Sequence, residues 1–445
     1  MAHRAAELTP GETPPPGPCP ACSLEHRVPI EEIVIGRDAR ERLGAYLDAR
    51  AWRRLLLVVD ANTADAAGDD LAADLAAAGH RVELQRFAHR HGLLADEEAV
   101  GAVRDRVAAH HPQVLLAVGS GVLTDVTRYA SFLERRPFLS VPTAASMDGY
   151  ASGVAAMQFE GVKVSLPAQP PLGIFADSAV LAAAPPEMLV WGLGDLAGKA
   201  TAHFDWLLAN GVAGETYCPL VAGRVLEPLG RCTEDAAALL GGEESAVVTL
   251  TEGLVSSGVA MAMLGSSRPA SGCEHHVSHF LDLLAFRGVR EHAPHGLQVG
   301  YACRFAAAVQ EAAIAHLGEA MVVAPGTTGP DERHWYGEQL LAIGPVRDEK
   351  QLWYAAHGDD WPSAADEVVA LAGRLTAASG GFAAVGRALD VASVPATPGF
   401  LGADLATLRG AFRYANRLRS RFTVLDLLEG QRRLDEVIEE VLPAR

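Results

Sequence analysis

Basic residues are scarce in this chain, and their scarcity limits the partners it can have. The 445 residues include 37 Lys and Arg against 55 Asp and Glu, which leaves a formal net charge of −18. Binding to nucleic acid depends on clustered Lys and Arg that face phosphates, so this balance argues against a nucleic-acid partner. A small phosphorylated substrate is compatible with it, because such a ligand needs only a few local donors.

Cysteines are also few, and no obvious membrane or export segment is visible. The six cysteines are scattered apart from Cys19 and Cys22, so we expect no disulfide framework. The first thirty residues lack the basic start and apolar run of a signal peptide. Gly, Pro or a charged residue interrupts each apolar stretch before it reaches bilayer length. These absences predict a cytoplasmic protein without a membrane partner.

The length and the composition predict two globular domains behind a short leader. A chain of 445 residues is too long for one ordinary core, and 49% hydrophobic with 21% charged residues is typical of a globular protein. Residues 1–28, rich in Pro and Gly, are expected to form a flexible leader. We expect an α/β domain over residues 29–180 and a helical domain over residues 181–445.

Apolar runs in the first domain alternate with stretches of helical spacing. The expected strands are 53–60, 80–87, 113–121 and 136–143, with helices at 70–79 and 97–111. This alternation predicts a parallel sheet with helices on both faces, whose ligands bind at the carboxyl ends of the strands. The later expected helices are 188–211, 247–264, 296–318 and 363–376, followed by a helix or helix pair at 414–428.

Two features in the first domain suggest a dinucleotide. The turn Gly119-Ser120-Gly121 follows an expected strand and would let the backbone approach a pyrophosphate at the start of a helix. A tight turn without a ligand explains it equally well, since the spacing is not G-x-G-x-x-G. Asp60, at the end of another strand, favours NAD over NADP if it meets the ribose hydroxyls, but it could simply form a turn.

The loop 141–153 follows the last of these strands. Its Thr, Ser and Asp side chains could contact nicotinamide and substrate, or could only cap the next helix. Its place at the carboxyl end of a strand favours a functional role.

Three distant segments each offer one metal ligand. Asp195, His275 and His295 together supply a carboxylate and two imidazoles, which suit a divalent transition metal with open positions. Lys199 and His279 lie one turn after Asp195 and His275, respectively. An Asp195–Lys199 surface ion pair is the alternative, although small and apolar neighbours favour burial. Spacing alone leaves a metal site and unconnected histidines both open.

Five segments in this order resemble the iron-containing alcohol dehydrogenase superfamily, and within it the sn-glycerol-1-phosphate dehydrogenases of bacteria. They are GSGVLTD, VPTAASMDGYAS, GLGDLAGKATAHFDW, SGCEHHVSHFLD and PHG, and RSRFTVLDLL near the C-terminus adds to them. The resemblance implies a Rossmann-like N-terminal domain and an all-α C-terminal domain, the dehydroquinate synthase-like architecture. It also implies an active site in the cleft between them and a homodimer or larger assembly.

The resemblance assigns roles residue by residue. Asp195, His275 and His295 take the metal positions, while Asp148, Asp195 and His279 take catalytic and substrate-contacting positions. Lys199 stands where iron-type members have a fourth ligand, so we expect zinc or nickel rather than iron; Lys199 and Lys163 are then candidates for the substrate phosphate. The cofactor positions, with Asp60 added from its place after a strand, are Gly119, Gly121, Val122, Leu123, Thr124, Asp125, Thr143, Ala144, Ala145, Ser146 and Ser152.

The implied reaction is reversible hydride transfer between NAD, or NADP, and the C2 centre of dihydroxyacetone phosphate, with the metal as a Lewis acid. The sequence does not choose a proton donor among Asp148, His279 and water. Alternatives on the same scaffold are a glycerol-type polyol dehydrogenase and a cyclitol or dehydroquinate synthase. An NAD-binding protein without catalysis is the least favoured alternative.

Three features depart from the family pattern. Ser120 replaces the middle of three glycines, which we expect the site to tolerate. The leader carries Cys19-Pro-Ala-Cys22 and His26, but a lone CxxC lacks the second ligand pair of a structural zinc, so a metal there is not favoured. Residues 325–400 match nothing in the pattern and could reshape the substrate pocket.

Overall fold

The computed structural model describes residues 17–90, 92–159, 162–325, 331–341, 343–357, 365–397, 399 and 402–442. Its internal contacts divide the chain into two compact units. Unit 1 comprises Met1–Leu196 and Leu220–Ser267, and unit 2 comprises Ala197–Pro219 and Arg268–Arg445. The division falls within one continuous helix, α7 (Pro186–Ala213).

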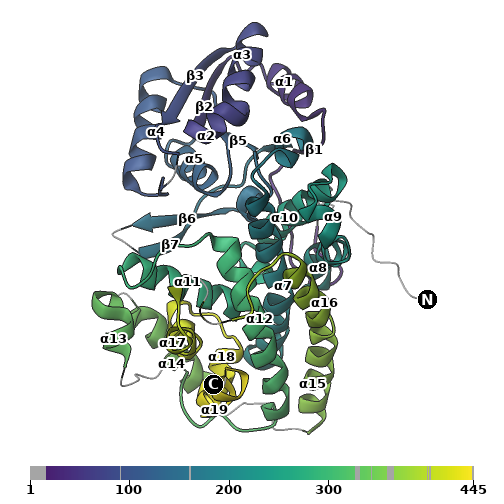
Figure 1. The fold of residues 1–445 in the computed structure, drawn as a ribbon, viewed down its shortest axis with the longest axis vertical. Coiled ribbons are helices and arrows are strands. Elements are labelled where there is room, and N and C mark those ends of the chain that lie inside the picture. The colour runs from purple at the N-terminus through teal and green to yellow at the C-terminus, as the bar shows by residue number, and fades with distance from the viewer. Residues whose placement is uncertain are drawn as a thin grey trace, which may run out of the picture. The chain divides into compact units, whose positions relative to one another are not determined.

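A six-stranded sheet forms the centre of unit 1 (Figure 1). All of its pairings are parallel, because each strand is separated from its neighbour by a crossover. In spatial order the strands are β1 (Glu32–Ile35), β8 (Gly173–Ala176), β5 (Phe138–Val141), β4 (Val114–Val118), β2 (Arg54–Asp60) and β3 (Arg81–Phe87). A separate antiparallel pair is formed by β6 (Val154–Phe159) and β7 (Val162–Pro167).

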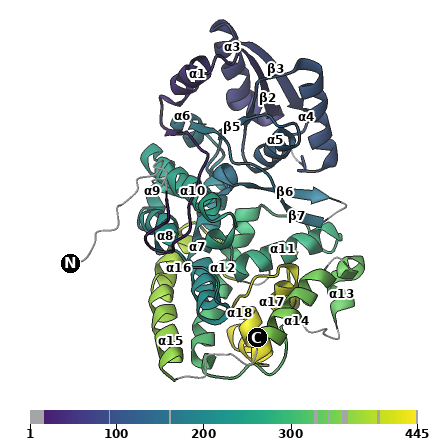
Figure 2. The ribbon, with the colours of Figure 1, turned by 180° about the vertical axis from the view of Figure 1, so that it is seen from behind.

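Helices cover both faces of this sheet, which explains the uninterrupted apolar runs of its central strands. On one face, α1 (Ala39–Ala49) and α3 (Asp69–Ala77) pack on Leu55 and Leu57 of β2. On the other, α4 (Glu97–His110) and α5 (Gly121–Leu133) pack on Leu56 and Val58 of the same strand. Figure 2 shows this sheet and its helices from behind. The expected parallel sheet, its four strands and the two helices between them are confirmed.

Unit 1 also includes helices that lie beyond residue 180. They are α6 (Ser178–Ala182), most of α8 (Pro219–Glu234), α9 (Ala236–Leu240) and α10 (Glu244–Leu264). At the start of α10, Glu244 accepts hydrogen bonds from Ser178 Oγ at 2.6 Å and from Arg37 Nε at 2.9 Å. The contacts therefore divide the chain differently from a single boundary at residue 180, because α10 packs on elements of the first domain.

The described part of the expected leader is folded against unit 1. Pro18 and Glu25 form an antiparallel bridge, and the Cys19 and His26 side chains are buried. The expectation of a flexible leader is corrected for residues 17–28, since their backbone bonds close a compact loop. Residues 1–16 of that leader lie outside the described residues.

The described residues of unit 2 form helices joined by loops, without a strand, as expected for an all-α C-terminal part. Besides the end of α7 it contains α11 (Cys273–Phe286), α12 (His295–Ala313), α13 (Glu332–Tyr336), α14 (Gly344–His357), α15 (Ala365–Ser379), α16 (Phe382–Val391), α17 (Leu405–Tyr414), α18 (Val424–Gly430) and α19 (Leu434–Val441). Of the two alternatives expected for 414–428, a helix or a helix pair, the structure has the pair: a 3-10 helix at Ala415–Leu418 follows α17, and α18 begins after Thr423. Residues 363 and 364 of the expected helix 363–376 lie outside the described residues.

Two helical stretches, Glu244–Leu264 and Asp366–Val391, are long and apolar enough to cross a membrane by length and composition. In the first stretch 72% of the apolar segment is buried inside the protein, as in a core helix, and in the second stretch 22% is buried. The expectation that no stretch reaches such a length is corrected by these two. Length and composition alone are weak evidence for a membrane span, and the second stretch comprises two separate helices, α15 and α16.

Candidate functional site

The turn between β4 and α5 presents the start of a helix at the carboxyl edge of the sheet. A Cβ atom at Gly119 would lie 2.4 Å from Leu123 Cδ1, so any other residue there would force the Leu123 side chain of α5 to move. At Gly121 the nearest atom to such a Cβ is Met147 Cγ at 3.7 Å, which is ordinary contact. The first amides of α5 have no partners within the helix, and its dipole favours an anion at this end.

The residues that follow this turn differ in what they contact. Thr124 Oγ1 is buried and lacks a hydrogen-bond partner among the described residues, so a donor or acceptor of a bound molecule would complete it. Asp125 instead forms an ion pair with Arg128. Arg128 also donates to the carbonyl oxygens of Gly149, Tyr150 and Val154, and so it ties α5 to that loop.

Asp60 caps a short helical turn. Its Oδ1 accepts the N–H of Thr63 at 2.8 Å, and Thr63 Oγ1 accepts the N–H of Asp60 at 3.0 Å. This reciprocal capping box accounts for an acidic residue at the end of β2 without any ligand. Contact with a ribose therefore stays a prediction.

The loop after β5 is held tightly against helices of unit 1. Tyr150 donates its hydroxyl to Ala144 O at 2.5 Å. On α7, a Cβ at Gly192 would lie only 2.0 Å from Ala145 O, so the helix backbone contacts this loop directly. Thr143 and Ser146 are buried, and Ser152 Oγ accepts the N–H of Val154 at 3.1 Å. Packing and backbone bonds therefore fix the expected cofactor loop.

Asp148 connects this loop to two helices. Its backbone N–H donates to Asp195 Oδ2 at 3.0 Å, which holds the Asp195 carboxylate against the loop backbone. Its own Oδ2 accepts a hydrogen bond from Ser257 Oγ of α10 at 2.9 Å. A Cβ at Gly258 would lie 2.8 Å from Asp148 O, so α10 also contacts the loop backbone. Both carboxylates are thus held by defined donors.

Three histidine rings gather in unit 2. His275 and His279 lie one turn apart on α11, with ring centroids 6.3 Å apart, and His295 lies 5.2 Å from His275 and 5.9 Å from His279. Glu274 Oε1 lies 2.7 Å from His275 Nδ1, which fixes that ring and turns Nε2 away from the carboxylate. Ser278 Oγ lies 3.4 Å from His295 Nδ1. His295 is the first residue of α12, one residue before the expected start at residue 296.

A buried acidic cluster beneath α11 has a structural role. Asp205 accepts the N–H groups of Cys273 and Val424 at 2.7 and 2.8 Å, and burial raises its pKa to about 7. Glu274 accepts the N–H of Gly272 and the hydroxyl of Thr201 at 2.7 and 2.9 Å. Burial raises the pKa of the Cys273 thiol well above its usual value, so this cysteine stays protonated. The cluster therefore fixes the start of α11 rather than offering a thiolate ligand.

Arginines in unit 2 form a cationic group that the sequence analysis did not single out. Arg419 Nη2 lies 3.2 Å from His279 Nδ1, and Arg421 donates to Ser271 O at 3.0 Å. Burial and then the charges of Arg268 and Arg419 lower the pKa of Arg421 to about 9. The sequence RSRF does place two arginines two residues apart. In the sequence analysis, however, this segment served only as part of the family resemblance. Of the two lysines expected as candidates for the substrate phosphate, Lys199 is buried on α7. The side chain of Lys163 lies outside those described.

Comparison with known proteins adds a family and a fold. Residues 34–185 match the family model described as iron-containing alcohol dehydrogenase. A Bacillus velezensis protein named glycerol-1-phosphate dehydrogenase [NAD(P)+] is 37% identical over 277 residues, covering 62% of this chain and 70% of the relative. One of the same name from Geobacillus stearothermophilus is 37% identical over 284 residues, covering 63% and 70%.

The fold has close counterparts among solved structures. A probable glycerol dehydrogenase from Sinorhizobium meliloti superimposes with a TM-score of 0.59 at 17% identity, covering 92% of this chain and 98% of that one. At this level of identity the likeness concerns the fold alone. The chain therefore has a Rossmann-like N-terminal part and a helical C-terminal part of the kind found in iron-containing alcohol dehydrogenases.

Proposed function

We propose that this chain, which belongs to the glycerol-1-phosphate dehydrogenase family, catalyses the reversible NAD(P)-dependent reduction of dihydroxyacetone phosphate to sn-glycerol 1-phosphate. The observation that carries the proposal is the 37% identity over 277 residues to a relative of that name. The arrangement of the candidate residues within each unit is compatible with this chemistry.

In this proposal Asp195, His275 and His295 hold one divalent metal ion. The fit rests on orientation, because Asp148 N–H holds the Asp195 carboxylate and Glu274 holds the ring of His275 with Nε2 turned outward. One carboxylate and two imidazoles suit zinc or nickel, and Lys199 stands in place of the fourth ligand of iron-type members. When bound, the ion supplies Lewis-acid polarisation of the substrate ketone.

Continuity of α7 supports including Asp195 in the set. The helix runs unbroken from Pro186 to Ala213, and residues three apart lie on one face of a helix. Gly198 follows Asp195 by three residues, and in unit 2 a Cβ at Gly198 would lie 3.7 Å from His275 Cε1. Asp195 and Gly198 therefore share one face of α7, and this supports including Asp195 in the proposed set.

The cofactor in this proposal binds at the start of α5. Gly121, Val122 and Leu123 would offer their amides to the pyrophosphate, and the unpaired hydroxyl of Thr124 would bond another cofactor oxygen. NADH, or NADPH, supplies the hydride. We place Asp60 near the adenosine ribose, which favours NAD, and the loop 143–146 near the nicotinamide.

We assign the substrate phosphate to Arg419 and Arg421. Two guanidinium groups that repel each other in a partly buried place are stabilised by a dianionic ligand. Because a guanidinium only donates, His279 Nδ1 accepts from Arg419, and the imidazole proton then resides on Nε2. From there His279 can donate a hydrogen bond to the carbonyl oxygen of the substrate and stabilise the negative charge that develops on that oxygen, with Asp148 as a further contact to the substrate.

A two-substrate assay tests the function. Oxidation of NADH is followed by absorbance with dihydroxyacetone phosphate and, separately, with unphosphorylated dihydroxyacetone. We expect a strong preference for the phosphorylated ketone, and in the reverse direction for sn-glycerol 1-phosphate over sn-glycerol 3-phosphate. Equal or faster turnover of dihydroxyacetone would indicate a polyol dehydrogenase instead. No net turnover of NADH would indicate a synthase or a protein that only binds NAD.

We further propose that the enzyme is a homodimer in the cytoplasm. Light scattering on the purified full-length chain tests the assembly, and a mass of one chain, 46.8 kDa, would contradict it.

A further inference from the structure

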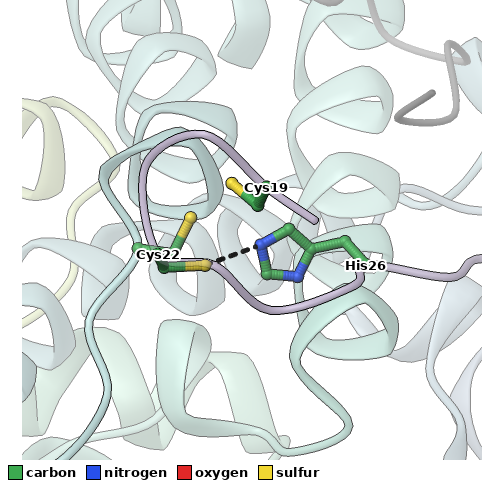
Figure 3. Close-up of side chains that lie close together, drawn as sticks. Cys19, Cys22 and His26 are labelled. Carbon is green, nitrogen blue, oxygen red and sulfur yellow. Dashed lines mark hydrogen bonds between the residues drawn. The ribbon is translucent and has the colours of Figure 1, made fainter. Parts of the chain in front are cut away.

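A second group of metal-type donors lies in the folded part of the leader. The Cys19, Cys22 and His26 side chains lie close together in unit 1 (Figure 3). None of them belongs to the proposed catalytic set. All six cysteines of the chain fall within the described residues, and none of them forms a disulfide.

The spacing of the donor atoms fits a small tetrahedral ion. One ligand atom from each of the three residues lies within 4.8 Å of the others, and Cys22 Sγ lies 3.2 Å from His26 Nε2. Zinc binds thiolate at about 2.3 Å and imidazole at about 2.0 Å, so the two donors of a tetrahedral site stand roughly 3.5 Å apart. Small side-chain movements would therefore complete the site.

The backbone around the cysteines forms a closed loop that brings the two thiols together. The N–H of Ser23 donates to Cys19 O at 2.8 Å, and the N–H of Cys19 donates to Leu24 O at 2.8 Å. Ser23 adopts a positive φ of 61°, which turns the chain back after Cys22. The bridge between Pro18 and Glu25 closes the loop directly before His26.

A distant carbonyl group orients His26. Its Nδ1 lies 2.9 Å from the backbone oxygen of Met263, which is 237 residues away in the last turn of α10. Because a carbonyl only accepts, Nδ1 carries the proton and Nε2 presents its lone pair to Cys22. Metal-binding histidines almost always donate their second nitrogen in this way. The ring is thus held in the tautomer that a metal needs.

We propose that Cys19, Cys22 and His26 bind one structural zinc ion, with a fourth donor completing the tetrahedron. Two thiolates and a neutral imidazole favour zinc over hard cations such as magnesium. Both cysteines lose their protons on binding, so affinity rises with pH. Through His26 and Met263 the ion ties residues 17–28 to the end of α10, the helix whose Ser257 holds Asp148.

Metal analysis of the full-length protein, purified without chelator, tests the proposal. Cys22→Ser and His26→Ala are each expected to lose one equivalent of zinc per chain relative to the wild type. Cys232→Ser is the matched control and keeps the wild-type zinc content, because burial raises the pKa of that thiol to about 12 and disfavours a thiolate. Zinc content unchanged in Cys22→Ser would overturn the proposal.

A sulfur-specific readout separates this site from the proposed catalytic metal, which has no sulfur ligand. In cobalt-substituted protein, thiolate-to-cobalt charge-transfer absorption is expected in the wild type and in Asp195→Ala, and it is expected to disappear in Cys22→Ser. If the variants do not fold, X-ray absorption of the wild-type zinc protein decides instead. Sulfur scattering at about 2.3 Å supports the site, and its absence overturns it.

Discussion

Removing the charge of Arg421 tests the phosphate assignment most sharply. The Arg421→Met variant keeps an unbranched apolar side chain but loses the guanidinium. Hydrogen bonds to charged groups contribute about 1.5–3 kcal/mol, so the expected fall in kcat/KM for dihydroxyacetone phosphate is roughly 10- to 150-fold. Burial, and then the positive charges of Arg268 and Arg419, lower the pKa of Arg421 to about 9, so the ligand-free protein holds this charge at a cost.

The comparison of two substrates makes this result specific. Initial rates of NADH oxidation are measured with dihydroxyacetone phosphate and with dihydroxyacetone, and only the phosphorylated substrate is expected to be affected. Arg413→Met is the matched control, because Arg413 forms an exposed ion pair with Asp435, and such pairs contribute little. Equal proportional losses on both substrates would mean a structural role for Arg421. No loss on the phosphorylated substrate would place the phosphate elsewhere.

Three further outcomes follow from the packing and the charges of the two units. Burial raises the pKa of Asp205 from 3.8 to about 7, so the native protein binds this proton more tightly than the unfolded chain does. The free energy of unfolding should therefore fall by about 4 kcal/mol as pH rises from about 4 to 7. In urea titrations Asp205→Asn should lose this slope, and an unchanged slope refutes the assignment. Gly192→Ala should lower the melting temperature and weaken NADH binding, because its Cβ would lie 2.0 Å from Ala145 O. The control Gly223→Ala, on an open part of α8, should be neutral or stabilise the protein by about 1 kcal/mol. Equal melting temperatures of the two variants would contradict this expectation. His279→Ala should slow reduction of dihydroxyacetone phosphate while metal content stays near normal, and loss of metal would make His279 a ligand.

The sequence predicted best those elements whose burial leaves an unmistakable pattern. The runs LLLVV in β2 and VLLAV in β4 are buried on both faces, so they are apolar without alternation. The strands β1 and β8 were not predicted, because EIVI and GIFA are four residues long and resemble many loop segments. Their strand character comes from pairing with each other, 141 residues apart, as between Glu32 and Gly173.

Local spacing also predicted which site residues share a helix, but it did not predict their partners. Two histidines four residues apart indicate one face of a helix, and α11 carries them so. Some bonds that orient these side chains are long-range, such as those between Met263 O and His26 and between Arg419 and His279. For that reason the CxxC of the leader was set aside as an incomplete ligand set. For Asp60 the decisive bonds are local: its capping box with Thr63 supports the turn-forming alternative.

Reduction of dihydroxyacetone phosphate is proposed to require a metal held by Asp195. Metal content and NADH oxidation measured on the same preparations of wild type and Asp195→Ala test it directly. We expect the variant to lose one equivalent of metal together with turnover, while its circular dichroism spectrum stays that of the folded protein. Full turnover in a variant without that metal would contradict it.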